Sequence, residues 1–176
     1  MKIKSVILLF ALALSLSAFA GGKYAGVPKK YHALLDRAMV TAGGNAKELK
    51  KALKEVPASE REGMAFLISY MPERDAKTLT ADFLKEHVQY AYKARNEFPW
   101  AKAVPNDIFL NDVVAYVNLN EERESWRKDF YERFKKYVAQ CKTMREAIDS
   151  VNKNIRDEVQ VDYNTKREKA DQAPYE

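Results

Sequence analysis

The stretch TADFLKEHVQYAY, residues 80–92, decides the fold class. Its apolar positions recur every three or four residues, which is the spacing of one face of an α-helix. That face comprises Phe83, Leu84, His87, Val88, Ala91 and Tyr92. Thr80 stands just before it, where a hydroxyl can accept a hydrogen bond from an amide of the first helical turn. The stretch therefore predicts a capped amphipathic helix.

Two shorter helices are predicted upstream of this stretch. Apolar residues recur at helical spacing over residues 31–39, until the glycine pair at 43–44 interrupts them. Asn45 then stands where it can cap a second helix, which carries an apolar pattern over residues 49–56. Pro57 ends this second helix, because proline has no amide hydrogen to continue the hydrogen-bond ladder.

Two capping boxes predict further helix starts. Ser59-x-x-Glu62 precedes the apolar run 64–71, and Thr143-x-x-Glu146 precedes an apolar stripe over 144–155. In a capping box the hydroxyl accepts from an early helical amide while the glutamate reaches back to the cap. We expect both pairs to begin a helix in this way.

The second half of the chain continues the helical pattern almost to its end. Pro105 suits the first position of a helix, and Asn118 or Asn120 is expected to begin the long helix that carries an aromatic stripe. The stripe comprises Trp126, Phe130, Phe134, Tyr137, Val138 and Cys141. Residues 159–163, VQVDY, alternate apolar and polar as a short strand does. The fold class predicted is all-α, a bundle of about seven amphipathic helices with a short strand-like segment and a polar C-terminal tail.

The first twenty residues are predicted to be a signal peptide. A basic start, MKIK, precedes an apolar run over 5–17 and the small-residue cleavage site Ala18-Phe19-Ala20. The run is shorter than the ~20 apolar residues that span a bilayer. We therefore expect an exported protein, periplasmic or secreted, with no stable membrane anchor after cleavage. The remaining organisation predicted is a flexible N-terminus at 21–29, a helical domain at 30–158, and a strand-like segment and tail at 159–176.

Composition narrows the function classes. The chain has 176 residues, 47% of them hydrophobic, which suffices for one globular domain without disulfides or metals. Its formal net charge of +5 falls to +3 once Lys2 and Lys4 leave with the signal peptide, because 28 basic side chains then face 25 acidic ones. So mild and evenly mixed a charge argues against nucleic acid as a partner.

The residues that usually carry catalysis are few. There are two histidines, His32 and His87, and one cysteine, Cys141, and no zinc, nucleotide or serine-hydrolase motif. His87 lies on an apolar helix face and is predicted to be a core histidine. Cys141 lies on the aromatic stripe and is predicted to be a buried, inert thiol within that helix. We therefore assign no catalytic residue, no cofactor-binding residue and no metal ligand, and expect no cofactor.

Four segments taken together have a familiar order. They are MPERD at 71–75, FPW at 98–100, PNDIFLNDV at 105–113 and NEERESWR at 120–127. With the tail REKADQAPYE at 167–176, they resemble the N-terminal helical region of bacterial exported transglutaminase-like proteins. In that family the tail leads into the catalytic cysteine motif of a papain-like core.

The resemblance implies acyl chemistry on peptide or amide bonds, by hydrolysis or transfer, with a cysteine, a histidine and an aspartate acting together. None of those three residues has a counterpart here, since Cys141 precedes the expected nucleophile and no histidine follows it. We therefore expect the N-terminal helical part of such an enzyme, inactive alone and truncated before the catalytic core. In full-length relatives this part is expected to pack against that core.

Two alternatives remain open. A stand-alone exported helical binding module would take a protein or peptide partner. An enzyme that uses Cys141 as a nucleophile would need a base within hydrogen-bond distance of the thiol.

Overall fold

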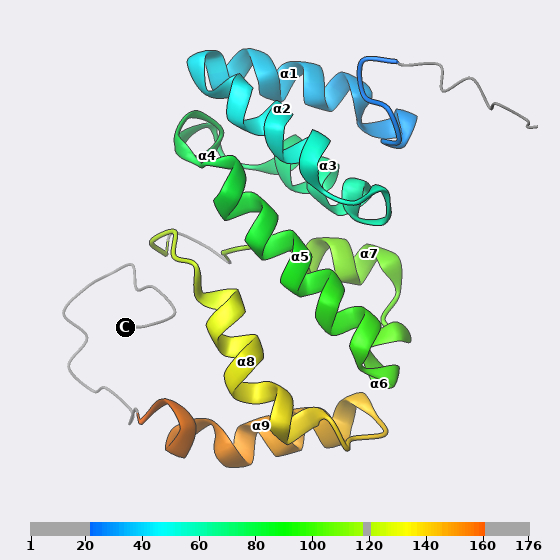
Figure 1. Ribbon diagram of the computed structural model, residues 1–176, viewed down its shortest axis with the longest axis vertical. Helices are drawn as coiled ribbons and strands as arrows, with labels where there is room; N and C mark the ends of the chain where they lie inside the picture. Colours follow the sequence, from blue (N-terminus) through cyan, green and yellow to red (C-terminus); the bar gives the residue numbers. More distant parts are fainter. Residues whose placement is uncertain (1–21, 118–120, 161–176) are drawn as a thin grey trace, which may run out of the picture.

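The computed structural model describes residues 22–117 and 121–160, and every regular element in these ranges is helical (Figure 1). The all-α prediction is confirmed. The helices of seven or more residues are α1 (His32–Ala42), α2 (Ala46–Glu55), α3 (Arg61–Tyr70), α5 (Ala81–Glu97), α8 (Trp126–Val138) and α9 (Met144–Val159). The shorter helices are α4 (Glu73–Thr78), α6 (Pro99–Lys102) and α7 (Asn106–Ile108). Single 3-10 turns occur at Lys29–Tyr31, Gly43–Asn45 and Ala58–Glu60, and a π-helical turn at Phe109–Val113.

Helix α5 connects the two ends of the molecule. It packs against α2 and α3 and also against α6 and α8, and α8 in turn packs on α9 (Figure 1). Such a position requires an apolar surface on more than one side. The predicted face meets this requirement, since Leu84, His87 and Val88 are fully buried.

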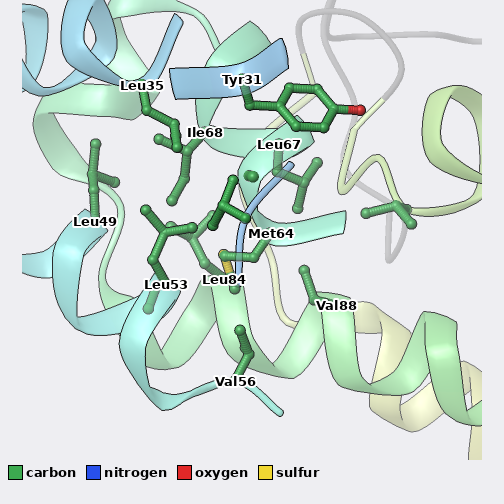
Figure 2. Packing of buried hydrophobic residues seen from close by; sticks show 14 of the residues in the cluster. Tyr31, Leu35, Leu49, Leu53, Val56, Met64, Leu67, Ile68, Leu84 and Val88 are labelled. Carbon is green, nitrogen blue, oxygen red and sulfur yellow. The ribbon is translucent and has the colours of Figure 1, made fainter. Parts of the chain in front are cut away.

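The main cluster is the hydrophobic core between α1, α2, α3 and α5. Figure 2 shows its aliphatic side chains filling the space between these helices. Leu35, Leu49, Met64, Ile68 and Leu84 have no exposed surface. Burial of one such side chain contributes about 1.5–3 kcal/mol, so this cluster dominates the stability of the fold.

A close approach of α3 to α5 depends on Gly63. The amide of Gly63 donates to the Tyr92 hydroxyl at 3.2 Å, and a Cβ at this position would lie 2.6 Å from the Tyr92 ring. Glycine is therefore needed here for space. The Tyr92 ring in turn meets Phe109 edge-on, with centroids 4.9 Å apart, which ties the π-helical turn to the core.

The second cluster lies under α8 and α9 and is much smaller. Its buried members are Phe98, Ala101, Tyr131, Val138 and Ala147. On α9 only Ala147 is buried, while Ile148 remains 52% exposed. The neighbouring helices therefore cover only a part of the apolar stripe of α9.

Of the four predicted helix caps at Asn45, Ser59, Thr80 and Thr143, two are confirmed and two are wrong. Thr80 accepts from the Phe83 amide and Thr143 from the Glu146 amide, both at 3.2 Å, which confirms these two helix starts. Ser59 caps nothing, because residues 58–60 form a 3-10 turn and α3 begins at Arg61. Asn45 precedes α2 but also does not cap it, because its amide group donates instead to the carbonyls of Ala76 and Leu79.

Two predicted boundaries are also wrong. The strand-like segment is not supported, because Val159 is the last residue of α9 and Gln160 adopts a left-handed conformation that ends it; residues 161–163 lie outside the described ranges. The long aromatic helix begins at Trp126 and not near residue 120, because residues 121–125 form an irregular segment whose polar groups bond other parts of the fold, as described below. The structure does not describe residues 118–120.

The structure tests the predicted N-terminal and C-terminal segments only in part. The signal peptide at 1–20 and the tail at 161–176 lie outside the described ranges. Within the segment predicted as a flexible N-terminus, Tyr24 and Val27 are buried against the main cluster. No helix in the described part of the chain is long and apolar enough to cross a bilayer.

Candidate functional site

A buried ion pair joins α4 to the segment before α8. The Asp75 side chain, in the first turn of α4, is 1% exposed and pairs with Arg123, which is 11% exposed. Arg123 Nε lies 3.0 Å from both carboxylate oxygens of Asp75, and Nη2 lies 2.8 Å from Oδ2. A guanidinium presents two parallel donors that match a carboxylate, so this pairing fixes direction as well as distance.

Tyr116 completes this Asp75 network, which consists of Asp75, Tyr116 and Arg123. Its hydroxyl donates to Asp75 Oδ2 at 2.8 Å. Burial, and then the adjacent Asp75 carboxylate, raise the pKa of Tyr116 well above its usual value, so the phenol stays protonated and remains a donor. The Tyr116 hydroxyl therefore serves as a fixed hydrogen-bond donor to Asp75, which suits a structural anchor.

His87 lies beside this network in an aromatic surround. Its Nε2 is 3.0 Å from the Glu124 carbonyl, and its Nδ1 is 3.4 Å from Arg127 Nε. A neutral imidazole that donates at Nε2 and accepts at Nδ1 satisfies both contacts. Burial, followed by the Arg127 charge, lowers the pKa of His87 to about 4. The sequence-based prediction of a core histidine is confirmed.

Trp126 and Arg127 lock the start of α8 in place. The Trp126 indole donates to the Tyr116 carbonyl at 3.0 Å, and the Arg127 guanidinium lies 4.6 Å from the centre of the Trp126 ring. Arg127 also donates to the Ala115 carbonyl. Burial lowers the pKa of Arg127 to about 10, so it remains charged at neutral pH. These contacts fix the position at which α8 begins.

The 106–117 segment supplies a large part of the lining of three hollows of the surface. One of about 250 Å³ lies against Trp126 and Arg127, one of about 590 Å³ lies against Phe66 and α7, and one of about 130 Å³ lies between Phe66 and Tyr116. The first two share Asp112, and the last two share Phe66. Tyr70 and Ile108, which are 60% and 47% exposed, add apolar surface near them.

Cys141 lies apart from all of these groups. Helix α8 ends at Val138, so Cys141 falls in the turn before α9 and not within a helix as predicted. The helix ends here because the Cys141 amide bonds the Val138 carbonyl in a tight turn and Thr143 begins the next helix. The thiol is half-buried, and its hydrogen-bond partner is the Tyr137 carbonyl at 3.6 Å. Neither histidine contacts it within the described ranges.

The described residues hold no group of three or more side chains that could bind a metal ion. Comparison with models of known protein families, with curated proteins and with solved structures finds no match to this chain. The function therefore has to be argued from the residues and their geometry.

Sequence reasoning identified the segments of this site but not their pairing. Asp75, Arg123, Trp126 and Arg127 all belong to segments singled out for their familiar order. Tyr116 was missed, because it lies between two of these segments. No local signal marks the pair, because Asp75 follows two charged residues and Arg123 follows two glutamates, so both stand in polar stretches of the sequence.

Proposed function

We propose that this chain is the N-terminal helical part of an exported transglutaminase-like cysteine enzyme, and that it is non-catalytic by itself. Its role is to hold a structured face against a transglutaminase-like core that acts on peptide or amide bonds. The support comes from the resemblance of the segments at 71–75, 98–100, 105–113 and 120–127.

The observation that carries the proposal is the meeting of the first and last of these segments in space. Asp75 from the first binds Arg123 from the last, across 48 positions of sequence. The segment at 105–113 lines two of the hollows described above. Two segments that resemble one family and share one buried ion pair have a common structural task, which is to shape this part of the molecule.

The lack of acyl chemistry in this chain follows from general mechanism. A thiol attacks an acyl carbon efficiently only as a thiolate, with an imidazole to take its proton and a carboxylate to orient that imidazole. Cys141 has a backbone carbonyl as its partner, and His87 is fully buried with both ring nitrogens occupied. The reacting groups must therefore come from the core.

The proposal is tested by extending the DNA sequence past codon 176 and by binding measurements. We expect an in-frame series of Cys, His and Asp downstream, and we expect a separately produced core to bind this chain. Absence of that series would count against the proposal. The chain alone is expected to show neither amide hydrolysis nor amine incorporation, and such activity by the purified chain would overturn the non-catalytic assignment.

Matched variants locate the face. Tyr70→Asp and Ile108→Asp place a charge on exposed positions beside the hollows, and they are expected to weaken core binding about tenfold or more, as interface aromatic and aliphatic anchors do. Val40→Asp is the control, because Val40 is 82% exposed on α1 and borders none of the three hollows. Equal loss in all three variants would argue against this face.

The alternative of a stand-alone binding module has one observation in its favour. The main cluster is built entirely from residues between Tyr24 and Val117, so it closes without any further domain. A chain of this kind would unfold cooperatively by itself and would yield a partner in a pull-down. The downstream sequence distinguishes the two functions.

A further inference from the structure

A basic hollow lies at the opposite end of the described chain from α9. It has a volume of about 330 Å³ and is enclosed by residues 22–27, the outer side of α2 and the first residue of α3. Four cationic side chains line it, and no carboxylate does: Lys23, Lys50, Lys54 and Arg61. This volume lies within the range of small-molecule sites in proteins.

The remainder of the hollow is apolar. Tyr24, Val27 and Leu53 line it with side chains that belong to the main cluster and are 7–9% exposed. An apolar wall beside several cations favours a ligand with two parts, an anionic group and an apolar body. A bare anion would leave that wall uncovered.

Three of the four cations, Lys50, Lys54 and Arg61, have no counter-charge within the described residues. Lys23 pairs with Asp36 at 2.6 Å, but Lys50 and Lys54 form no ion pair within the described residues. They lie one turn apart on α2, where like charges repel. By contrast, Lys51 on the same helix lies 3.7 Å from Asp82. The two lysines of α2 that border the hollow therefore carry charge that no acidic side chain of the described residues balances.

The fourth cation, Arg61, is held in a fixed position. Its Nη1 donates to the Ala25 carbonyl at 3.2 Å, and its Nε is buried with no hydrogen-bond partner. The chain turns over this guanidinium at Gly26, whose φ is +75° and where a Cβ would lie 2.7 Å from Nη1. The turn thus favours glycine for its dihedral angle, and a Cβ at this position would displace the Arg61 guanidinium. A guanidinium with donors in reserve, held beside an apolar wall, is a prepared partner for an anion.

We propose that this hollow binds a small anionic amphiphile. Its phosphate or carboxylate group lies among Lys50, Lys54 and Arg61, and its short alkyl or aryl body lies on Tyr24, Val27 and Leu53. This binding is separate from the proposed face at 106–117 and does not depend on a catalytic core. The same chemistry is offered by a lipid fragment and by a free organic phosphate or acid.

The test uses hexyl phosphate as the probe, with inorganic phosphate and 1-hexanol as separate arms, measured by isothermal titration calorimetry and amide chemical shifts. We expect hexyl phosphate to bind, with shifts at residues 22–27 and 50–61, and to bind at least about tenfold more tightly than either half-molecule. Absence of binding at millimolar probe would overturn the proposal. Equal binding of inorganic phosphate would overturn the amphiphile assignment.

A charge-matched pair of double variants distinguishes a site from general attraction. Lys50→Gln with Lys54→Gln is expected to weaken hexyl phosphate binding about tenfold or more, because it removes two uncompensated charges that line the hollow. Lys47→Gln with Lys51→Gln removes the same charge from the same helix but from positions that do not line the hollow, and binding should change less than about twofold. Equal loss in the two double variants would show non-specific electrostatics and would overturn the site. All four lysines are exposed, so both variants should fold, and circular dichroism checks this.

Discussion

The main cluster and the second cluster are built from the same kind of amphipathic helix, but they bury it to different extents. Around α1, α2, α3 and α5 the large aliphatic side chains have no exposed surface. Around α8 and α9 the buried residues are five, and Met144, Ile148 and Ile155 remain 39–52% exposed. A helical apolar stripe thus predicts a helix equally well in both places, but it does not predict how completely a neighbour covers the stripe.

The Asp75 network and His87 lie between these two regions. Their hydrogen bonds hold Arg123 and Glu124, in the irregular segment 121–125, and so help to set where α8 begins. The stability of α8 and α9 therefore depends on polar contacts to the main cluster as well as on their own packing.

Removal of the Asp75 carboxylate should have the largest effect. Asp75→Ala leaves the Arg123 guanidinium buried without a counter-charge, which typically costs about 3–5 kcal/mol in the free energy of unfolding. Urea denaturation followed by circular dichroism measures the loss. Arg123→Met in the same background should recover part of it, because no buried charge then remains. A loss below about 1 kcal/mol would show that the pair is not what joins the two regions.

Truncation of a core side chain should separate the two clusters. Leu84→Ala opens a cavity at a position with no exposed surface, and we expect a loss of about 3 kcal/mol. Ile148→Ala, on the exposed stripe of α9, should cost less than about 1 kcal/mol. The two variants are compared by their midpoints of urea denaturation, with the same dependence of the free energy of unfolding on urea concentration. Similar losses would mean that α9 is as well buried as α5, contrary to the comparison.

Acid should weaken the junction through His87. Because burial and Arg127 lower the folded-state pKa to about 4, from an ordinary 6.5, the folded protein binds the proton less readily than the unfolded chain does. The stability from neutral His87 is therefore full above pH 6.5 and is lost as the pH falls towards 4, by up to about 3 kcal/mol.

Measurement of the free energy of unfolding between pH 7.5 and 4 gives this dependence of stability on pH. A His87→Gln variant, which has no group that titrates at this position, serves as the control and should show a flatter profile over the same interval. An unchanged slope in the variant would assign the acid sensitivity to other groups.

Loss of a helix cap should have the smallest effect on stability. The part of the molecule that is destabilised should differ between the two capped helices. Thr80→Ala and Thr143→Ala each remove one hydrogen bond to an early amide, and each should cost about 1 kcal/mol. Hydrogen exchange should show faster opening across the main cluster for Thr80→Ala, but only in α9 for Thr143→Ala. Ser59→Ala is the control, and its stability should be unchanged within about 0.5 kcal/mol because Ser59 caps nothing.

Much of the fold could be predicted from local patterns. The all-α class, the starts of α5 and α9 at Thr80 and Thr143, and the burial of His87 all follow from spacing and side-chain chemistry within one turn or face. The failures share a cause. Asn45 and residues 121–125 were predicted from their neighbours in sequence, but their side chains bond partners more than 30 positions away.

The sequence alone determined which segments are helical, because the 3.6-residue repeat of apolar side chains and the threonine caps act within a few residues of the chain. Only the tertiary structure decided that Asp75, Tyr116 and Arg123 form one network and that the lysines of α2 meet Arg61 around one hollow. A buried charge is stable only beside its partner, and that partner is selected by the packing of the helices and not by proximity along the chain.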